Sequence, residues 1–129
     1  MPRYLSREWL TAAREAISAS GALADAAHDV TLTVEQNVVA GPDGDVVFHI
    51  VVDHGTVQIA EGQAEDPTVT FTQDWSTASA VARGEMSAQG AFMRGLISVR
   101  GDVSKLVEYG GVFVGLDDVL FELRAQTEY

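Results

Sequence analysis

The sequence contains no cysteine and a single lysine, Lys105. Without cysteine the chain forms no disulfide and offers no thiol nucleophile. No apolar run approaches the length of about 18 residues that a membrane-spanning helix needs. The first ten residues, MPRYLSREWL, carry charges every few positions and therefore lack the apolar centre of a signal peptide. These absences predict a soluble, cytoplasmic protein.

Positive charge is scarce as well. The 129 residues include 8 basic and 19 acidic side chains, which gives a formal net charge of -11. Such a surface repels phosphate backbones and anionic lipid headgroups. We therefore expect no nucleic-acid partner and at most transient contact with a membrane. The length, with 47 % hydrophobic residues, suits one domain over residues 1–129 that is large enough for a core.

Catalytic motifs are missing too. The three histidines, His28, His49 and His54, do not have the spacing of a metal site. The chain has no G-x-S-x-G motif of serine hydrolases and no glycine-rich phosphate-binding loop. We therefore predict no enzyme activity, no catalytic residues, no metal and no cofactor. His49 lies within a predicted strand, where a partly buried structural role is expected.

The first half of the sequence predicts a helix followed by three strands. The helix spans Tyr4–Ser20, with Ser6 as its N-cap and a broad apolar face that should lie on a core. Alternating apolar residues and glycine-containing turns then predict strands over Val30–Ala40, Asp45–Asp53 and Thr56–Ala60. A polar, acidic loop follows over Glu61–Asp66.

The stretch Asp66–Glu108 predicts strand, helix, helix, strand and helix. Pro67–Gln73 alternates threonine with apolar residues, and Leu96–Arg100 is the second strand. Asp74 is placed to cap a helix that ends at Gly84. Ser87 is placed to cap a second helix, which ends at Gly95. The whole pattern predicts an α+β fold, with a five-stranded, mostly antiparallel sheet covered by helices on one face.

The segment Tyr109–Asp118, YGGVFVGLDD, contains three glycines among large apolar residues. Each glycine lowers helix stability by about 1 kcal/mol relative to alanine, so a break or hinge is expected there. Asp117 or Asp118 can start a new helix. One stripe of that helix collects four apolar residues, namely Leu116, Val119, Leu120 and Leu123.

Three short motifs in this order resemble the sterol carrier protein 2 (SCP-2) family. They are the strand VTFT, the helix SAQGAFMRG and the strand LISVRGD, with the capped helix from Asp74 between the first two. The resemblance is specific over Asp66–Val107 and rests on pattern alone before that. It implies a lipid-binding domain with a tunnel between sheet and helices for sterols, fatty acyl chains or phospholipids. It also implies that the C-terminal segment closes this tunnel.

The sequence thus predicts a carrier of a hydrophobic small molecule or lipid. Ten apolar side chains of the sheet, the middle helices and the last segment are candidates to line the cavity: Phe48, Ile50, Trp75, Phe92, Met93, Val112, Phe113, Leu116, Leu120 and Phe121. Burying a lipid chain contributes about 0.8 kcal/mol per methylene, enough for micromolar binding without polar contacts.

Two alternatives belong to other classes. In the first, the apolar C-terminal segment recruits a partner enzyme or a second copy to form a homodimer, since Phe121 lies off the apolar stripe of its helix. In the second, the protein is a small enzyme for lipid-like substrates, for which His49 is the candidate group. That enzyme needs His49 to face the cavity.

Overall fold

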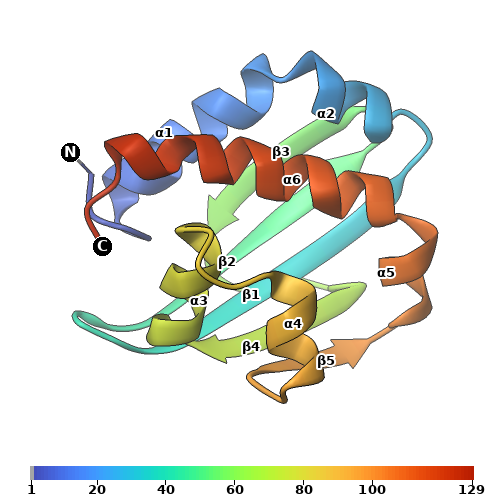
Figure 1. The fold of residues 1–129 in the computed structure, drawn as a ribbon. Helices are drawn as coiled ribbons and strands as arrows, with labels where there is room; N and C mark the ends of the chain where they lie inside the picture. Colours follow the sequence, from blue (N-terminus) through green and yellow to red (C-terminus); the bar gives the residue numbers. More distant parts are fainter. Residues whose placement is uncertain (1) are drawn as a thin grey trace.

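The computed structural model describes residues 2–129 and shows a sheet of five strands with helices on one side (Figure 1). The elements follow the predicted order closely. In chain order they are α1 (Arg7–Ala19), α2 (Gly21–Ala26), β1 (Thr31–Gly41), β2 (Gly44–Asp53), β3 (Thr56–Glu61), β4 (Val69–Asp74), α3 (Trp75–Ala82), α4 (Ala88–Met93), β5 (Ile97–Gly101), α5 (Ser104–Glu108), α6 (Gly110–Glu122) and the 3-10 turn η1 (Leu123–Gln126).

The strands lie in the order β3-β2-β1-β4-β5. Every neighbouring pair is antiparallel except β1 and β4, which run parallel, so the predicted, mostly antiparallel sheet of five strands is confirmed as a mixed sheet. Val34 in the middle of β1 is paired with Ile50 of β2 and Val69 of β4. Because all three residues are buried, this register places an apolar row across the centre of the sheet.

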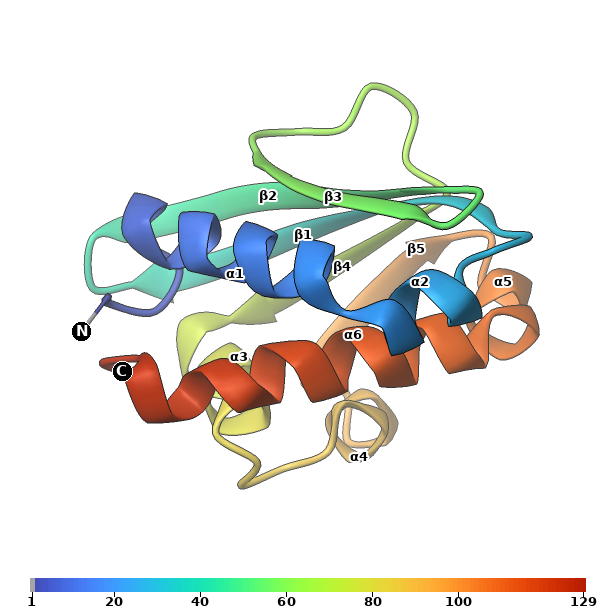
Figure 2. The same cartoon turned by 90° about the horizontal axis from the view of Figure 1, so that it is seen from above.

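The helices cover one face of the sheet (Figures 1 and 2), and buried apolar residues of β1 and β2 form one core with residues of α1 and α6. Alternate residues on each strand share a face, which explains why one set is buried and the intervening residues are not part of the same core. The buried set on the two central strands is Leu32, Val34, Val38, Phe48, Ile50 and Val52.

The opposite face of the sheet is crossed by the loop between β3 and β4. Because β4 is paired with β1, the chain must pass over β2 and β1 to reach its place, and Figure 2 shows this loop on the side away from the helices. A carboxylate oxygen of Glu35 accepts a hydrogen bond of 2.9 Å from the amide of Ala64. The ring nitrogen Nδ1 of His49 lies 2.9 Å from the carbonyl oxygen of Gly62. These two contacts attach the crossing loop to the sheet.

Side-chain caps set the limits of the first two helices. Ser6 accepts a hydrogen bond from the amide of Trp9, as its sequence position predicts. Ser20 ends α1 and caps α2 through the amide of Leu23, so the chain bends between them. Helix α1 also packs along β3, where the Arg14 guanidinium donates a 3.2 Å hydrogen bond to the Ile59 carbonyl.

The caps of the middle helices are confirmed as well. Asp74 accepts a 2.7 Å hydrogen bond from the amide of Thr77, and this bond holds the pKa of Asp74 below its ordinary value. Ser87 caps α4 through the amide of Gly90. Gly84 and Gly95 follow the two helices with φ angles of +80° and +77°, a conformation that favours glycine.

The break predicted in Tyr109–Asp118 falls at its first residue, since α5 ends at Glu108 and Tyr109, with φ -109° and ψ 32°, separates it from α6. The predicted restart further along the segment is wrong. Helix α6 begins at Gly110 and continues without interruption to Glu122, so neither Asp117 nor Asp118 starts a new helix. Gly115 lies against Leu23 of α2, and a Cβ atom at this position would come within 3.1 Å of Leu23 Cδ1. The close approach of α2 and α6, together with the buried stripe of α6, outweighs the low helix propensity of glycine.

The two ends of the described chain are joined. Arg3 and Glu128 form a parallel β-bridge, and the indole nitrogen of Trp9 donates a 3.2 Å hydrogen bond to the Thr127 hydroxyl. The described residues include no helix that is long and apolar enough to cross a membrane.

Candidate functional site

The space between α6 and the sheet is filled by part of the predicted ligand-lining set. Phe48 and Ile50 point from β2 toward the helices, and Val112 and Leu116 point from α6 toward the sheet. All four side chains are buried and belong to one continuous core. The centre of the candidate site is therefore an apolar interior that is packed by side chains.

Toward β4 this interior is less completely covered. Phe113 of α6 meets Phe71 of β4 edge to face, with 6.3 Å between the ring centroids, and both rings are half-buried. Leu120 lies on the same stripe of α6, seven residues later, and is also half-buried. We call Phe71, Phe113 and Leu120 the α6 seam. All three side chains pack against the core and keep part of their surface accessible to solvent.

One carboxyl group stands on the same stripe. Asp117 follows Phe113 by four residues and precedes Leu120 by three, which places it between them on the helix surface. Desolvation, and then the charge of Asp118, raise the pKa of Asp117 to about 6, although the residue as a whole is exposed. The apolar side chains of the seam thus lie beside a carboxyl group whose pKa is raised.

The remaining predicted residues are distributed differently. Trp75 is half-buried against the core at the start of α3, and its ring lies 6.2 Å from that of Tyr4. Phe92 and Met93 are exposed on α4, with 78 % of Met93 accessible to solvent. Phe121 is 37 % exposed and contacts Gly84 and the Arg124 guanidinium. Seven of the ten predicted side chains therefore meet in or against the core, whereas these last three lie at its outside.

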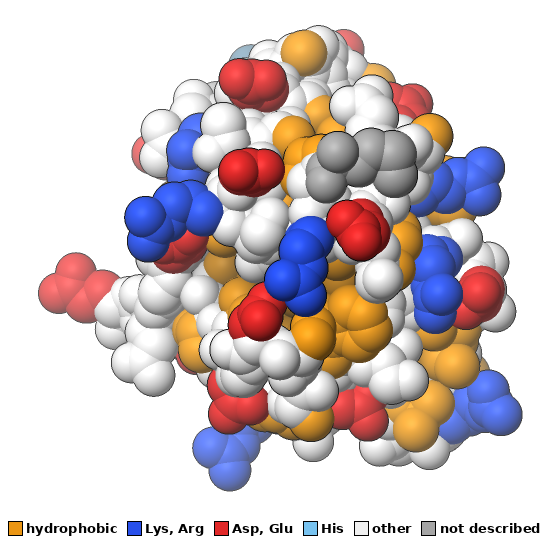
Figure 3. All heavy atoms as spheres, turned by 90° about the vertical axis from the view of Figure 1, so that its left-hand side faces the viewer, with side chains coloured by type: hydrophobic (Ala, Val, Ile, Leu, Met, Phe, Trp, Pro, Cys, Tyr) orange, Lys and Arg blue, Asp and Glu red, His pale blue; other side chains and the backbone are white. Residues whose placement is uncertain are grey.

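A hollow of about 520 Å³ lies on the side of the molecule that carries both ends of the chain. Figure 3 views that side and shows hydrophobic side chains between charged ones. Its wall includes Tyr4, Val46, Trp75 and Tyr129, with the 3.2 Å ion pair of Arg3 and Asp43 beside them. Of the predicted residues only Trp75 lines this hollow. The other residues that line the hollow could not be predicted from the sequence. They come together because the two chain ends pair, and that pairing leaves no periodic pattern in the sequence.

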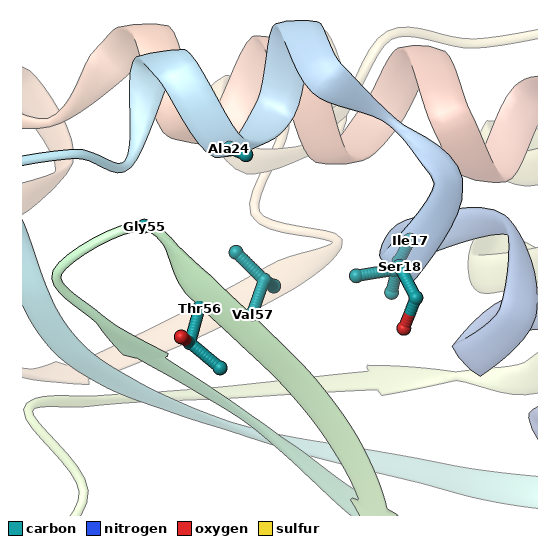
Figure 4. A pocket seen from close by; sticks show the side chains of 6 residues that line it. All are labelled: Ile17, Ser18, Ala24, Gly55, Thr56 and Val57. Carbon is teal, nitrogen blue, oxygen red and sulfur yellow. The ribbon is translucent and has the colours of Figure 1, made fainter.

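A smaller hollow of about 180 Å³ separates the α1–α2 bend from the start of β3 (Figure 4). Its wall includes Ile17, Ala24 and Val57, and Val57 points from the strand toward the helices. Sites for small organic ligands usually measure about 300–1,000 Å³, so this hollow is below that range.

His49 does not face the interior. It points to the sheet face opposite the helices and contacts Gly62, which fits the structural role predicted for it. Among residues 2–129 no group of three or more His, Cys, Asp or Glu side chains is arranged to hold a metal ion.

The fold is shared by solved structures of other proteins. A crystal structure of sterol carrier protein 2 has 23 % identity and a TM-score of 0.77, and the match covers 93 % of this chain and 98 % of that one. A conserved hypothetical protein of Thermus thermophilus, suggested to be a sterol carrier protein, has 22 % identity and a TM-score of 0.76 over 95 % of this chain and 91 % of that one.

A third similar structure belongs to a longer protein. The inverting sec-alkylsulfatase Pisa1 from Pseudomonas matches with 21 % identity and a TM-score of 0.52, over 69 % of this chain and 14 % of that one. At these levels of identity the three structures establish the fold alone. No protein with a curated description matches the sequence. The sequence profile described as the SCP-2 sterol transfer family matches residues 10–114, most of the chain, and the protein therefore belongs to that family.

Proposed function

We propose that this protein is a non-enzymatic carrier that holds a sterol, fatty acyl chain or other lipid between its sheet and its helices. Membership of the SCP-2 sterol transfer family suggests lipid or sterol binding or transfer. The observation that carries the proposal for this chain is the α6 seam, where the apolar side chains of Phe71, Phe113 and Leu120 pack against the core and are only half-buried. A lipid chain that displaces these side chains reaches Phe48 and Ile50 beneath them.

The carboxyl group on the seam favours one class of lipid. Asp117 can accept a hydrogen bond from an alcohol, whereas at neutral pH its charge and that of Asp118 repel the carboxylate of a fatty acid. The proposal is therefore that a sterol-like alcohol binds more tightly than an ionised fatty acid. The preference should weaken as the pH falls toward the raised pKa of Asp117, which is about 6.

Titration with a fluorescent sterol and with a fluorescent fatty acid tests both statements. Saturable sterol binding that Leu120→Gln weakens is the expected result, because the amide puts a polar group into the seam. Val114→Gln is the matched control, since Val114 is exposed on another side of the same helix. Asp117→Asn should increase fatty acid binding at neutral pH. The carrier proposal is refuted if neither probe binds saturably and native mass spectrometry finds no lipid on the purified protein.

The recruitment role that the sequence left open has less support. Its proposed anchor, Phe121, is engaged within the chain, where the ring lies against Gly84 and the Arg124 guanidinium is 4.0 Å from its centroid. A concentration-independent dimer in light scattering that Phe121→Asp dissociates, with no lipid bound, would favour recruitment over the carrier.

A further inference from the structure

The hollow beside the two chain ends has the size and the walls of a ligand site, and the lipid carrier makes no use of it. Its volume of about 520 Å³ lies within the range of sites for small organic molecules. Its walls come from four separate parts of the chain, namely residues 3–6, the end of the β1–β2 hairpin, the start of α3 and residues 128–129. Because the tertiary fold brings these four parts together, the hollow is not a feature of one flexible loop.

Three aromatic side chains lie in the wall of the hollow. The ring of Tyr4 lies 6.2 Å from that of Trp75 and 5.1 Å from that of Tyr129, measured between centroids. Trp75 and Tyr129 are half-buried, so part of each side chain can contact a ligand. Gly41 lets the hairpin lie against the indole, since a Cβ atom there would come within 3.2 Å of Trp75 Cδ1. The wall is thus an aromatic surface that close packing holds in place.

The charged side chains in the wall of the hollow are two acids and one base, Asp43, Glu128 and Arg3. Arg3 and Asp43 form an ion pair of 3.2 Å, but both side chains are more than half exposed, so the pair is weak. Two further acids, Asp45 and Asp74, adjoin the wall in the sequence and are exposed. Negative charge therefore predominates around the aromatic rings, as it does over the whole chain.

Two more arginines lie over nearby rings but do not line the hollow. The Arg83 guanidinium lies 5.5 Å from the centroid of Tyr129 and is paired with Glu85 at 3.1 Å, and Arg124 lies over Phe121. The ring of Tyr129 thus already contacts a cation of the chain. The indole of Trp75 is the kind of ring that attracts cations most strongly, and no cation of residues 2–129 lies over it.

We propose that the hollow binds a small organic cation of the alkylammonium class. Its ammonium group lies against the Trp75 indole and beside the carboxylates of Asp43 and Glu128, and its alkyl groups contact the rest of the apolar wall. Aromatic faces are the surfaces by which proteins recognise quaternary ammonium ligands, and an adjacent carboxylate adds charge attraction. At long range the net charge of -11 attracts cations and repels anions.

An anionic ligand fits the same hollow less well. The features that favour an anion are Arg3 and the partial positive charge at the N-termini of α1 and α3. Arg3 is already paired with Asp43. Glu8 in the first turn of α1 and Asp74 at the cap of α3 offset the partial charges of the two helices. Glu128, by contrast, forms no ion pair within residues 2–129, so its charge can attract a bound cation.

The hollow and the α6 seam are separate. None of Phe71, Phe113 and Leu120 lines the hollow, and a cation can enter it without opening the apolar interior. The cation site therefore goes beyond the carrier function and does not depend on it.

An NMR titration of the full chain tests the proposal with three probes of similar shape and different charge. They are choline, its neutral isostere in which carbon replaces the ammonium nitrogen, and the anion tert-butylacetate. Choline should shift the indole N–H resonance of Trp75 saturably, with a dissociation constant of about 1 mM or below. The neutral and anionic probes should bind about tenfold more weakly or not at all. The indole of Trp9, which is bonded to Thr127 in the core, is the internal control and should respond much less.

Calorimetric titration of variants with choline tests the individual groups. Trp75→Leu should weaken binding about fivefold, and Trp75→Phe, which keeps an aromatic face, should weaken it less. Asp43→Asn and Glu128→Gln should each weaken it about two- to fivefold. Arg3→Gln should strengthen it, because the guanidinium competes with the ligand for Asp43. Glu65→Gln removes an exposed acid from the crossing loop, outside the hollow, and should have no effect. Urea unfolding establishes that each variant folds.

Three results would overturn the cation site. They are a Trp75 resonance that choline does not shift, a neutral isostere that binds as tightly as choline, and an Arg3→Gln variant that binds choline more weakly than the wild type. A fourth concerns the carrier: choline should not displace the fluorescent sterol, and displacement would assign the hollow to the lipid site instead. Choline binding without saturable sterol binding refutes the carrier function alone, so the two failures can be told apart.

Discussion

Replacing Gly84 by alanine tests how the end of α3 is joined to the C-terminal helix. Two costs are expected. The φ angle of +80° at Gly84 is unfavourable for alanine by about 1 kcal/mol. A Cβ atom there would also lie 2.5 Å from Cε2 of Phe121, so the Phe121 ring must shift from its position. Overpacking of this kind costs about 1–3 kcal/mol, and we expect Gly84→Ala to lower the free energy of unfolding by about 2–4 kcal/mol in total.

Gly95→Ala is the matched control. Gly95 has nearly the same φ angle, +77°, but nothing lies within 4 Å of a Cβ atom at this position. Gly95→Ala should therefore lower the free energy of unfolding by only about 1 kcal/mol, the cost of the positive φ angle. This corresponds to a decrease in Tm of a few degrees. Urea unfolding followed by the fluorescence of Trp9 and Trp75 measures both variants.

A double-mutant cycle isolates the contact with Phe121. In the background of Phe121→Ala, Gly84→Ala should cost no more than Gly95→Ala, because the ring that it displaces is gone. The reasoning is refuted if Gly84→Ala costs no more than Gly95→Ala in the wild type, or if its excess cost persists without Phe121.

Three further predictions concern buried or charged polar groups. Glu35→Leu should cost about 1–3 kcal/mol and speed hydrogen exchange at Ala64, whose amide loses its acceptor on the crossing loop. Thr127→Val should cost a similar amount and change the Trp9 fluorescence, because the buried indole N–H loses its partner. Asp117→Asn should stabilise the protein at neutral pH, with a gain that disappears on acidification.

The sign of the last prediction follows from proton binding. Between the ordinary pKa of 3.8 and the raised value of about 6, the folded state binds more protons at Asp117 than the unfolded state. Stability therefore falls as the pH rises through this window, and the asparagine variant avoids the loss. Urea unfolding of the wild type and of Asp117→Asn at pH 4 and pH 7.5 measures this difference in stability. A gain that is equal at both pH values, or that Asp118→Asn reproduces in full, would contradict this account.

The local elements were predictable because their signals are local. Ser6, Asp74 and Ser87 were identified as caps from residue type and position, and the structure places each at the expected helix start. Alternating apolar residues and glycine-containing turns likewise identified β1 and β2 as strands.

Other features depend on contacts between distant residues. The continuity of α6 depends on Leu23 of α2 lying against Gly115, about 90 residues away in the sequence, and no propensity scale contains that contact. The parallel pairing of β1 with β4, and with it the position of the crossing loop over Glu35, follows from strand order and not from strand pattern.

The candidate site divides in the same way. Apolarity and helical spacing were sufficient to select Phe113 and Leu120, which form the seam with Phe71. The same two criteria could not distinguish Phe113 and Leu120 from the exposed Phe92 and Met93, because equally apolar residues on a short helix can face the core or the solvent. That distinction is made by the packing of α4 on β5 and α3.

The hydrogen bond from Arg14 to the Ile59 carbonyl has a consequence for self-association. An open sheet exposes unpaired backbone groups on its two outer strands, and these groups can add a strand from another chain and begin aggregation. At β3 the Arg14 guanidinium already donates a hydrogen bond to one of these carbonyl groups, and α1 lies along the strand. A strand from another chain can therefore pair poorly with this edge. The other outer strand, β5, is only five residues long and carries an exposed arginine, Arg100. The protein thus limits strand addition at both edges of the sheet by different means. Arg14→Ala should expose the edge of β3, the longer of the two outer strands.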